Sequence, residues 1–184
     1  LDPALRRKFN LLKRTLSMPA PDDADLRNEL AKTASGMESA YGKGTFCPKG
    51  KTDCMDLGAL SVELASSRDP AWMQELWTGW REVGTNLKGS YTRYVELANM
   101  GAESMGYADL GELWRSSYDM DPDAFAQEVD RLWGQVRPLY EQLHCYVRAG
   151  LQKQYGEGMV PSGKEIPAHL LGNMWAQEWG NLYA

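Results

Sequence analysis

The most restrictive feature of this chain is its scarcity of the β-branched aliphatic residues that build strands. Valine and isoleucine together occur only eight times among 184 residues, and Ile166 is the single isoleucine. Strands favour these residues because a branched side chain packs well on a pleated surface. Seven Trp and nine Tyr supply much of the apolar area instead, and large aromatic side chains fill wide spaces between helices. The composition predicts an all-α protein.

One long apolar stripe has the period of a helix. Asp121 can accept hydrogen bonds from the first free backbone N–H groups, and Pro122 suits the first helical position, so we expect one helix over 121–155. Pro138 predicts a kink near Gly134. The apolar residues of the stripe recur at steps of three and four, which indicates a buried face. They are Phe125, Val129, Leu132, Trp133, Val136, Leu139, Tyr140, Leu143, Val147 and Leu151.

Two further prolines mark helix starts in the same way. Pro70 follows Asp69 ahead of an aromatic helical segment, and Pro167 stands before a helix that begins at 168–171. Other helical stretches are expected at 2–16, 24–41, 56–67, 87–105 and 109–118. The loops between them hold most of the Gly and Pro, and no internal repeat is evident. Residues 1–184 are therefore predicted to form a single helical unit.

The charge balance excludes some classes of partner. Twenty basic and twenty-five acidic residues give a net charge of −5, which disfavours nucleic acid and anionic membrane surfaces. Five basic residues on 2–16 are interpreted as a solvated face. No apolar run reaches the roughly 18 residues of a membrane span. The first residues lack a start methionine and an apolar signal core, so the chain is expected to begin inside a longer precursor.

The cysteines bear on the cellular compartment. Cys47 and Cys54 flank a short loop with Gly and Pro, which lets its ends approach. A disulfide there would contribute about 2.5 kcal/mol in the chain-entropy model and would indicate an extracytoplasmic protein. The competing interpretation is that the two cysteines are ligands of a zinc ion, although they would form only half of such a site. Cys145 lies within the long apolar helix, where a thiol is typically a small buried hydrophobe.

Catalytic motifs are missing from the sequence. The two histidines, His144 and His169, do not form the His-Glu-x-x-His motif of a helical zinc protease. No nucleophile elbow, phosphate loop or dinucleotide fingerprint occurs. Trp72, Trp77 and Trp80 recur at helical spacing and are interpreted as core packing rather than as a platform for peptide side chains.

One segment carries a specific resemblance. The stretch Ile-Pro-Ala-His-Leu-Leu-Gly-Asn-Met-Trp-Ala-Gln at 166–177 resembles the signature of the angiotensin-converting enzyme family, the zinc peptidyl-dipeptidases that remove dipeptides from peptide C-termini. Leu-Trp-Arg-Ser at 113–116, Pro-Leu-Tyr at 138–140 and Tyr-Gly at 155–156 follow the family's order and spacing. The loop from Cys47 to Cys54 corresponds to the family's first disulfide. Cys145 and the absence of an Asn-x-Ser/Thr site make the sequence similar to a bacterial member.

The resemblance implies an ellipsoid of helices divided by a deep cleft, of which this chain is the N-terminal and middle portion. In the family the zinc-binding helix and the groups that hold the substrate's C-terminal carboxylate lie downstream of 184. This chain would therefore lack the catalytic residues and the metal ligands. An apolar face carrying Trp175, Trp179 and Leu182 would be exposed without the remaining C-terminal half.

Two positions match anion-binding residues of the family. Arg115 corresponds to an arginine that binds a first buried chloride, and Tyr155 to a tyrosine that contacts a second. A guanidinium presents fixed donors to an anion, and a phenol O–H can donate one hydrogen bond. The alternatives are an ion pair of Arg115 with Glu112 and simple packing for Tyr155. His169 is interpreted as a hydrogen-bonded structural histidine, not as a ligand.

These observations lead to one functional hypothesis and two alternatives. The chain is expected to be part of a secreted or periplasmic zinc-dependent dipeptidyl carboxypeptidase that acts on peptide substrates, with zinc held outside this chain and chloride as a second ion. The first alternative is a truncated, non-catalytic helical module for binding or structure. The second keeps the fold but releases one residue at a time.

Overall fold

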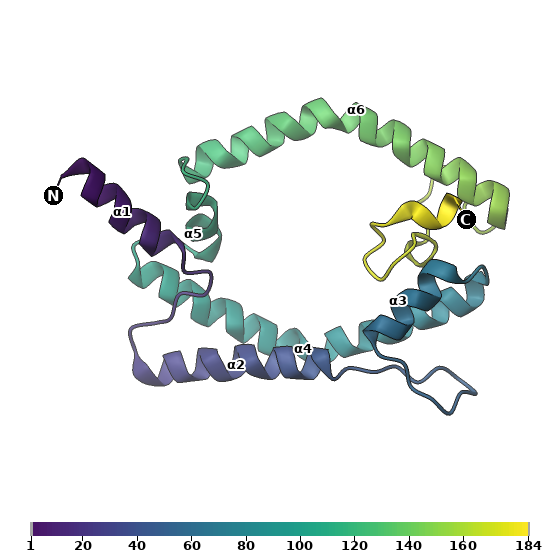
Figure 1. Cartoon of the computed structure of the whole chain (residues 1–184), viewed down its shortest axis with the longest axis horizontal. Helices are drawn as coiled ribbons and strands as arrows, with labels where there is room; N and C mark the ends of the chain where they lie inside the picture. The colour runs from purple at the N-terminus through teal and green to yellow at the C-terminus, as the bar shows by residue number, and fades with distance from the viewer. Residues whose placement is uncertain (1, 184) are drawn as a thin grey trace. The chain divides into compact units, whose positions relative to one another are not determined.

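The computed structural model describes residues 2–183, which contain six α-helices, two short 3₁₀ helices and, apart from the bridge between Phe46 and Met55, no strand pairing (Figure 1). The prediction of an all-α fold is confirmed. The α-helices, in chain order, are α1 (Pro3–Arg14), α2 (Ala24–Gly42), α3 (Leu57–Ser66), α4 (Pro70–Ser104), α5 (Leu110–Ser116) and α6 (Pro122–Tyr155), and the 3₁₀ helices are η1 (Ala168–Leu170) and η2 (Trp179–Tyr183).

Aspartate caps set the helix starts as the sequence indicates. The Asp121 carboxylate accepts from the backbone N–H groups of Asp123 and Ala124 at 3.0 and 3.1 Å. Asp69 caps α4 in the same way, and Asp56 and Asp109 cap α3 and α5. Each cap satisfies donors that have no partner inside the helix.

Two expectations about the helices are wrong. The segments predicted to start at Pro70 and at residue 87 form the single helix α4, because no proline or polar cluster interrupts the chain between them. The segment after Pro167 forms only the three-residue η1 and a series of turns. The Asn173 side chain accepts there from the backbone N–H groups of Trp175 and Gln177, and such local bonds compete with helix formation.

The chain divides into two compact units. Unit 1 comprises Leu1–Ser39 and Leu87–Gln135, and unit 2 comprises Ala40–Asn86 and Val136–Ala184. The expectation that 1–184 belong to one incomplete peptidase domain stays a prediction. The kink expected near Gly134 falls where α6 passes from one unit to the other and also stays a prediction.

Unit 1 is built on the C-terminal part of α4. Ala98 and Ala102 of α4 pack against Leu110 and Leu113 of α5 in a small core. On another side α2 runs beside α4 (Figure 1), and the Arg93 guanidinium donates to both Glu29 carboxylate oxygens at 2.7 and 2.9 Å. α1 contributes no buried residue, so polar contacts hold it to this unit.

Unit 2 holds the larger core. Trp80 is 2% exposed, which confirms the packing interpretation for this residue, and the half-buried Trp72 and Trp77 pack around the same core. The core combines α3, α4, the end of α6 and the segment after it. Its buried members are Leu60, Leu64, Met73, Leu76, Trp80, Val147, Leu151, Val160, Ile166, Leu170, Leu171 and Met174.

The expected burial of α6 is wrong for most of its stripe. Only Val147 and Leu151 are buried, whereas Leu139 is 73% exposed and Trp133 is 48% exposed. Cys145 is also exposed, contrary to the sequence interpretation. Of the three residues expected on an uncovered face, Trp175 is exposed, but Trp179 and Leu182 pack against the core of unit 2.

The structure contains a disulfide between Cys47 and Cys54. We expect the purified protein, when not reduced, to have a mass two units below its fully reduced value, with Cys145 as its one alkylatable thiol. Replacing both cysteines by Ser should lower stability by about 2.5 kcal/mol, because the unfolded chain regains loop freedom. Three thiols reacting in the unreduced native protein would refute the bridge.

Candidate functional site

The site predicted around Arg115 lies wholly within unit 1. The Asn99 side chain of α4 accepts from the Leu110 backbone N–H at 3.0 Å, which ties the start of α5 to α4. Leu110 and Leu113 face the core of the unit. Arg115 follows two residues after Leu113, so it lies on a different side of the short helix.

Arg115 lines a cavity of about 320 Å³ between α4 and α5. Tyrosine and tryptophan rings, one amide and one carboxylate share this wall with it: Tyr91, Tyr94, Val95, Asn99, Asp109, Leu110, Gly111 and Trp114. Asp109 is engaged as the cap of α5. The cavity therefore presents a guanidinium beside aromatic rings.

The guanidinium of Arg115 has unused donors. Its Nε is buried, and within residues 2–183 this atom has no hydrogen-bond partner. The alternative ion pair with Glu112 is not formed, since the Glu112 carboxylate accepts from the Ala108 backbone N–H instead. Within residues 2–183 the Arg115 guanidinium forms no hydrogen bond or ion pair, so the donors that line the cavity are available to an anion. The residues present fit a chloride ion.

Tyr155 lies in unit 2 as the last residue of α6. It is half-buried and packs against the core, and its hydroxyl oxygen accepts from the Gln154 side-chain amide at 3.1 Å. Burial raises the pKa of Tyr155, and the nearby positive charge of Arg68 acts in the opposite direction. The phenol is thus protonated at neutral pH and keeps its own hydrogen for donation. Packing and anion contact are both compatible with this geometry.

The described residues do not fit a zinc ion. Nowhere in 2–183 do three or more His, Cys, Asp or Glu side chains gather in a metal-binding group. His144 lies against the rings of Tyr140 and Trp179. His169 is 8% exposed, and burial lowers its pKa, so its imidazole is neutral at pH 7. The sequence interpretation of His169 as a hydrogen-bonded structural residue is not supported at Nε2, which has no hydrogen-bond partner among the described residues.

Sequence reasoning missed a second cavity in unit 1. Arg6, Arg7 and Arg14 of α1 face Asp119, which follows α5, around a space of about 430 Å³. The basic residues were interpreted as a solvated face because their charge pattern alone names no partner. The spacing of Arg7 and Arg14, seven residues apart, places both on one side of the helix, but nothing in the sequence indicates that Asp119 faces them.

Comparison with known proteins identifies the chain's relatives. The sequence pattern of the peptidase M2 family, angiotensin-converting enzyme, matches residues 1–184. Angiotensin-converting enzyme of Theromyzon tessulatum is 36% identical over 187 residues, covering 98% of this chain and 30% of that protein. The enzyme of Oryctolagus cuniculus is 40% identical over 185 residues, covering 99% of this chain and 14% of that protein. Angiotensin-converting enzyme-like protein Ace3 of Mus musculus is 40% identical over 148 residues, 79% of this chain and 20% of that protein.

The helical fold and this match along the whole chain define a member of a peptidase family. The chain belongs to the angiotensin-converting enzyme family. It spans less than a third of each of these relatives. The resemblance based on the stretch at 166–177 is confirmed at the level of the family, whereas a bacterial origin stays a prediction.

Proposed function

We propose that this chain is part of a zinc-dependent peptidyl-dipeptidase that releases dipeptides from peptide C-termini. The observation that supports the proposal is the family match over residues 1–184, joined to 36–40% identity with the three relatives described above. Since the described residues hold no set of metal ligands, zinc and the catalytic groups would come from the remaining part of the same protein. That part is also the partner proposed for the exposed stripe of α6.

The proposed location is outside the cytoplasm, secreted or periplasmic. The disulfide between Cys47 and Cys54 supports this, because such bonds persist in oxidising compartments. Among the helices of residues 2–183, none has the length and apolar character needed to cross a bilayer.

Product analysis of the longer natural protein tests the activity. Incubation with a decapeptide should release dipeptides in succession from its C-terminus, detected by mass spectrometry, and a zinc chelator should stop the release. Single C-terminal residues among the products would indicate a carboxypeptidase instead. No cleavage of any peptide would favour the non-catalytic helical module and contradict the proposal.

We further propose that Arg115 and Tyr155 each contribute to binding a chloride ion in the longer protein. For Arg115 the support is its position in a cavity with a buried, unpartnered Nε. For Tyr155 it is a protonated hydroxyl that keeps a hydrogen for donation. Chloride bound at Arg115 would accept charge-assisted hydrogen bonds from a guanidinium that has no ion pair among the described residues.

Replacing Arg115 by Gln should raise the chloride concentration needed for half-maximal peptidase activation by about tenfold, because a hydrogen bond to a charged group contributes about 1.5–3 kcal/mol. The measurement is activity across a chloride series, with an inert anion holding ionic strength constant. Arg131→Gln is the matched control, since among the described residues Arg131 pairs only with Glu128, and both side chains are exposed on α6. An unchanged chloride response in the Arg115 variant would contradict the anion role.

A further inference from the structure

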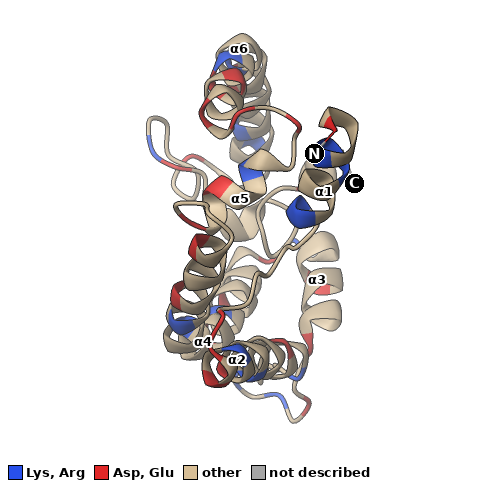
Figure 2. Cartoon of the chain, turned by 90° about the vertical axis from the view of Figure 1, so that its left-hand side faces the viewer, with Lys and Arg blue, Asp and Glu red and all other residues tan. Residues whose placement is uncertain are grey.

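The cavity between α1 and Asp119 has an uneven charge. Three guanidinium groups, of Arg6, Arg7 and Arg14, line it together with the single carboxylate of Asp119. Two positive charges are therefore uncompensated within its wall. This contrasts with the net charge of −5 of the whole chain, and Figure 2 shows the basic residues of α1.

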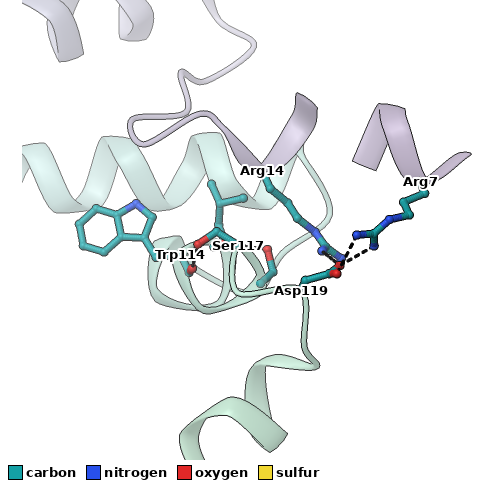
Figure 3. A network of polar contacts seen from close by, with 7 residues as sticks. Arg7, Arg14, Trp114, Ser117 and Asp119 are labelled. Carbon is teal, nitrogen blue, oxygen red and sulfur yellow. Dashed lines mark hydrogen bonds and ion pairs between the residues drawn. The ribbon is translucent and has the colours of Figure 1, made fainter. Parts of the chain in front are cut away.

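One arginine already holds a carboxylate in the manner expected for an oxyanion ligand. Arg7 donates from Nη1 to Asp119 Oδ1 at 2.7 Å and from Nη2 to Oδ2 at 2.8 Å, which is a bidentate pair (Figure 3). Arg14 approaches the same carboxylate with its Nη1 3.6 Å from Oδ1. The Arg7 guanidinium lowers the pKa of Asp119, so this carboxylate is ionised at neutral pH.

The other donors of the cavity are free for a ligand. Within residues 2–183 the Arg6 guanidinium forms no hydrogen bond or ion pair, and the Arg14 guanidinium makes only the 3.6 Å contact of its Nη1 with Asp119. Asn10 adds an amide to the lining. The volume of about 430 Å³ is many times the roughly 10–15 Å³ of cavity volume that one water molecule needs. The space is sufficient for a phosphate group or an acidic side chain.

Asp119 itself is held in an unusual backbone conformation. Its φ of 57° lies in the left-handed region, which is uncommon for residues other than Gly but is tolerated by Asp. Its salt bridges to Arg7 and Arg14 connect this turn to α1, which has no buried residue of its own. The Asp119 carboxylate thus occupies part of a guanidinium-lined site and competes with any external oxyanion.

We propose that this cavity is a binding site for a divalent oxyanion, held by Arg6 and Arg14 beside the pair of Arg7 with Asp119. The shared chemistry is two negative charges on oxygen atoms, supplied by a free phosphate or by two neighbouring carboxylates of an acidic peptide. Guanidinium groups suit both, because their forked donors match phosphate and carboxylate geometry. The site is separate from the cavity at Arg115 and does not depend on the proposed peptidase function.

Calorimetric titration of the 184-residue protein with inorganic phosphate and, separately, with the dipeptide Glu-Glu tests the site at constant ionic strength. We expect saturable binding of at least one probe below about 10 mM, and the probe that binds more tightly identifies the source of the oxyanion. Arg6→Gln should weaken that binding about tenfold. Arg6 has no partner among the described residues, so this variant removes no contact that holds the fold.

Two further variants complete the test. Lys8→Gln is the matched control, because it removes one positive charge from α1 without touching the cavity. The affinity of this variant for the probe should stay within about twofold of the affinity of the unmodified protein. Asp119→Asn should tighten binding several-fold, since it removes the competing charge. The proposal would be overturned if neither probe saturates the protein, or if Arg6→Gln and Lys8→Gln lose binding affinity equally. It would also be overturned if Asp119→Asn binds the probe more weakly while its helicity is unchanged.

Discussion

Replacing Gly172 by Ala should destabilise unit 2 by about 3 kcal/mol or more, which corresponds to a melting temperature about 6–12 °C lower for a chain of this size. Gly172 has a φ of 78°, in the left-handed region where a Cβ is unfavourable. A Cβ at this position would also run into the backbone carbonyl oxygen of Glu178. Because a backbone atom cannot move aside as the end of a flexible side chain can, the substitution must shift the turn that places Leu170 and Met174 in the core.

Gly163→Ala provides the matched control for this prediction. Gly163 has the same φ of 78°, but a Cβ there meets no atom within 4 Å. Its substitution should therefore cost only the backbone strain, about 1 kcal/mol. Thermal unfolding followed by circular dichroism measures both variants. Equal melting temperatures for the two would show that the contact with Glu178 does not restrain the segment.

The sequence predicted helices best where a start signal and an apolar period agree. Asp121 with Pro122 and Asp69 with Pro70 mark helix starts that the structure reproduces, because a cap and a proline act locally and need no tertiary contact. The end of the helix that begins at Pro70 was harder to predict. Gly79, Gly84 and Gly89 lie inside α4, where Gly weakens a helix without ending it.

The stretch at 166–177 shows the opposite case. Its sequence is highly specific for the family, yet its proline start does not lead to an α-helix. Two residues in the left-handed region, Gly172 and Ala176, break the helical path. Asn181 donates from its side chain to the Leu170 carbonyl oxygen at 3.1 Å. These conformations depend on contacts formed only after folding, so local propensity did not indicate them.

Burial on α6 could not be predicted from periodicity alone. The stripe from Val129 to Leu143 has the spacing of a buried face, but its large apolar side chains are exposed in the described chain. Periodicity predicts which side of a helix is apolar, whereas burial depends on what packs against that side. A stripe of this size is typical of an interface, in agreement with the proposal that the remaining part of the protein packs there.

The candidate sites were predictable to different degrees. Arg115 was found because the family resemblance indicated it, and the structure adds its cavity and its unpartnered Nε. The cavity at Asp119 joins residues more than 100 positions apart in the sequence. Only the fold brings them together, and neither charge pattern nor motif in a single sequence encodes that pairing.

We propose that this chain is part of a zinc peptidase whose zinc ligands lie in the remaining part of the protein. A catalytic zinc needs three protein ligands in a defined arrangement. Within 2–183 no three His, Cys, Asp or Glu side chains form such a group, and His169 is buried. The 184-residue protein should therefore neither retain zinc nor cleave peptides, whereas the longer natural protein should do both.

The most direct measurement is the zinc content of both proteins, each incubated with zinc, dialysed exhaustively against zinc-free buffer and analysed by mass spectrometry of the metal. The disulfide should be kept intact in both, because reduced cysteines bind zinc nonspecifically. We expect a stoichiometric zinc ion in the longer protein and none above background in the 184-residue protein. One tightly held zinc ion in the 184-residue protein, lost when His144 or His169 is replaced by Ala, would contradict it.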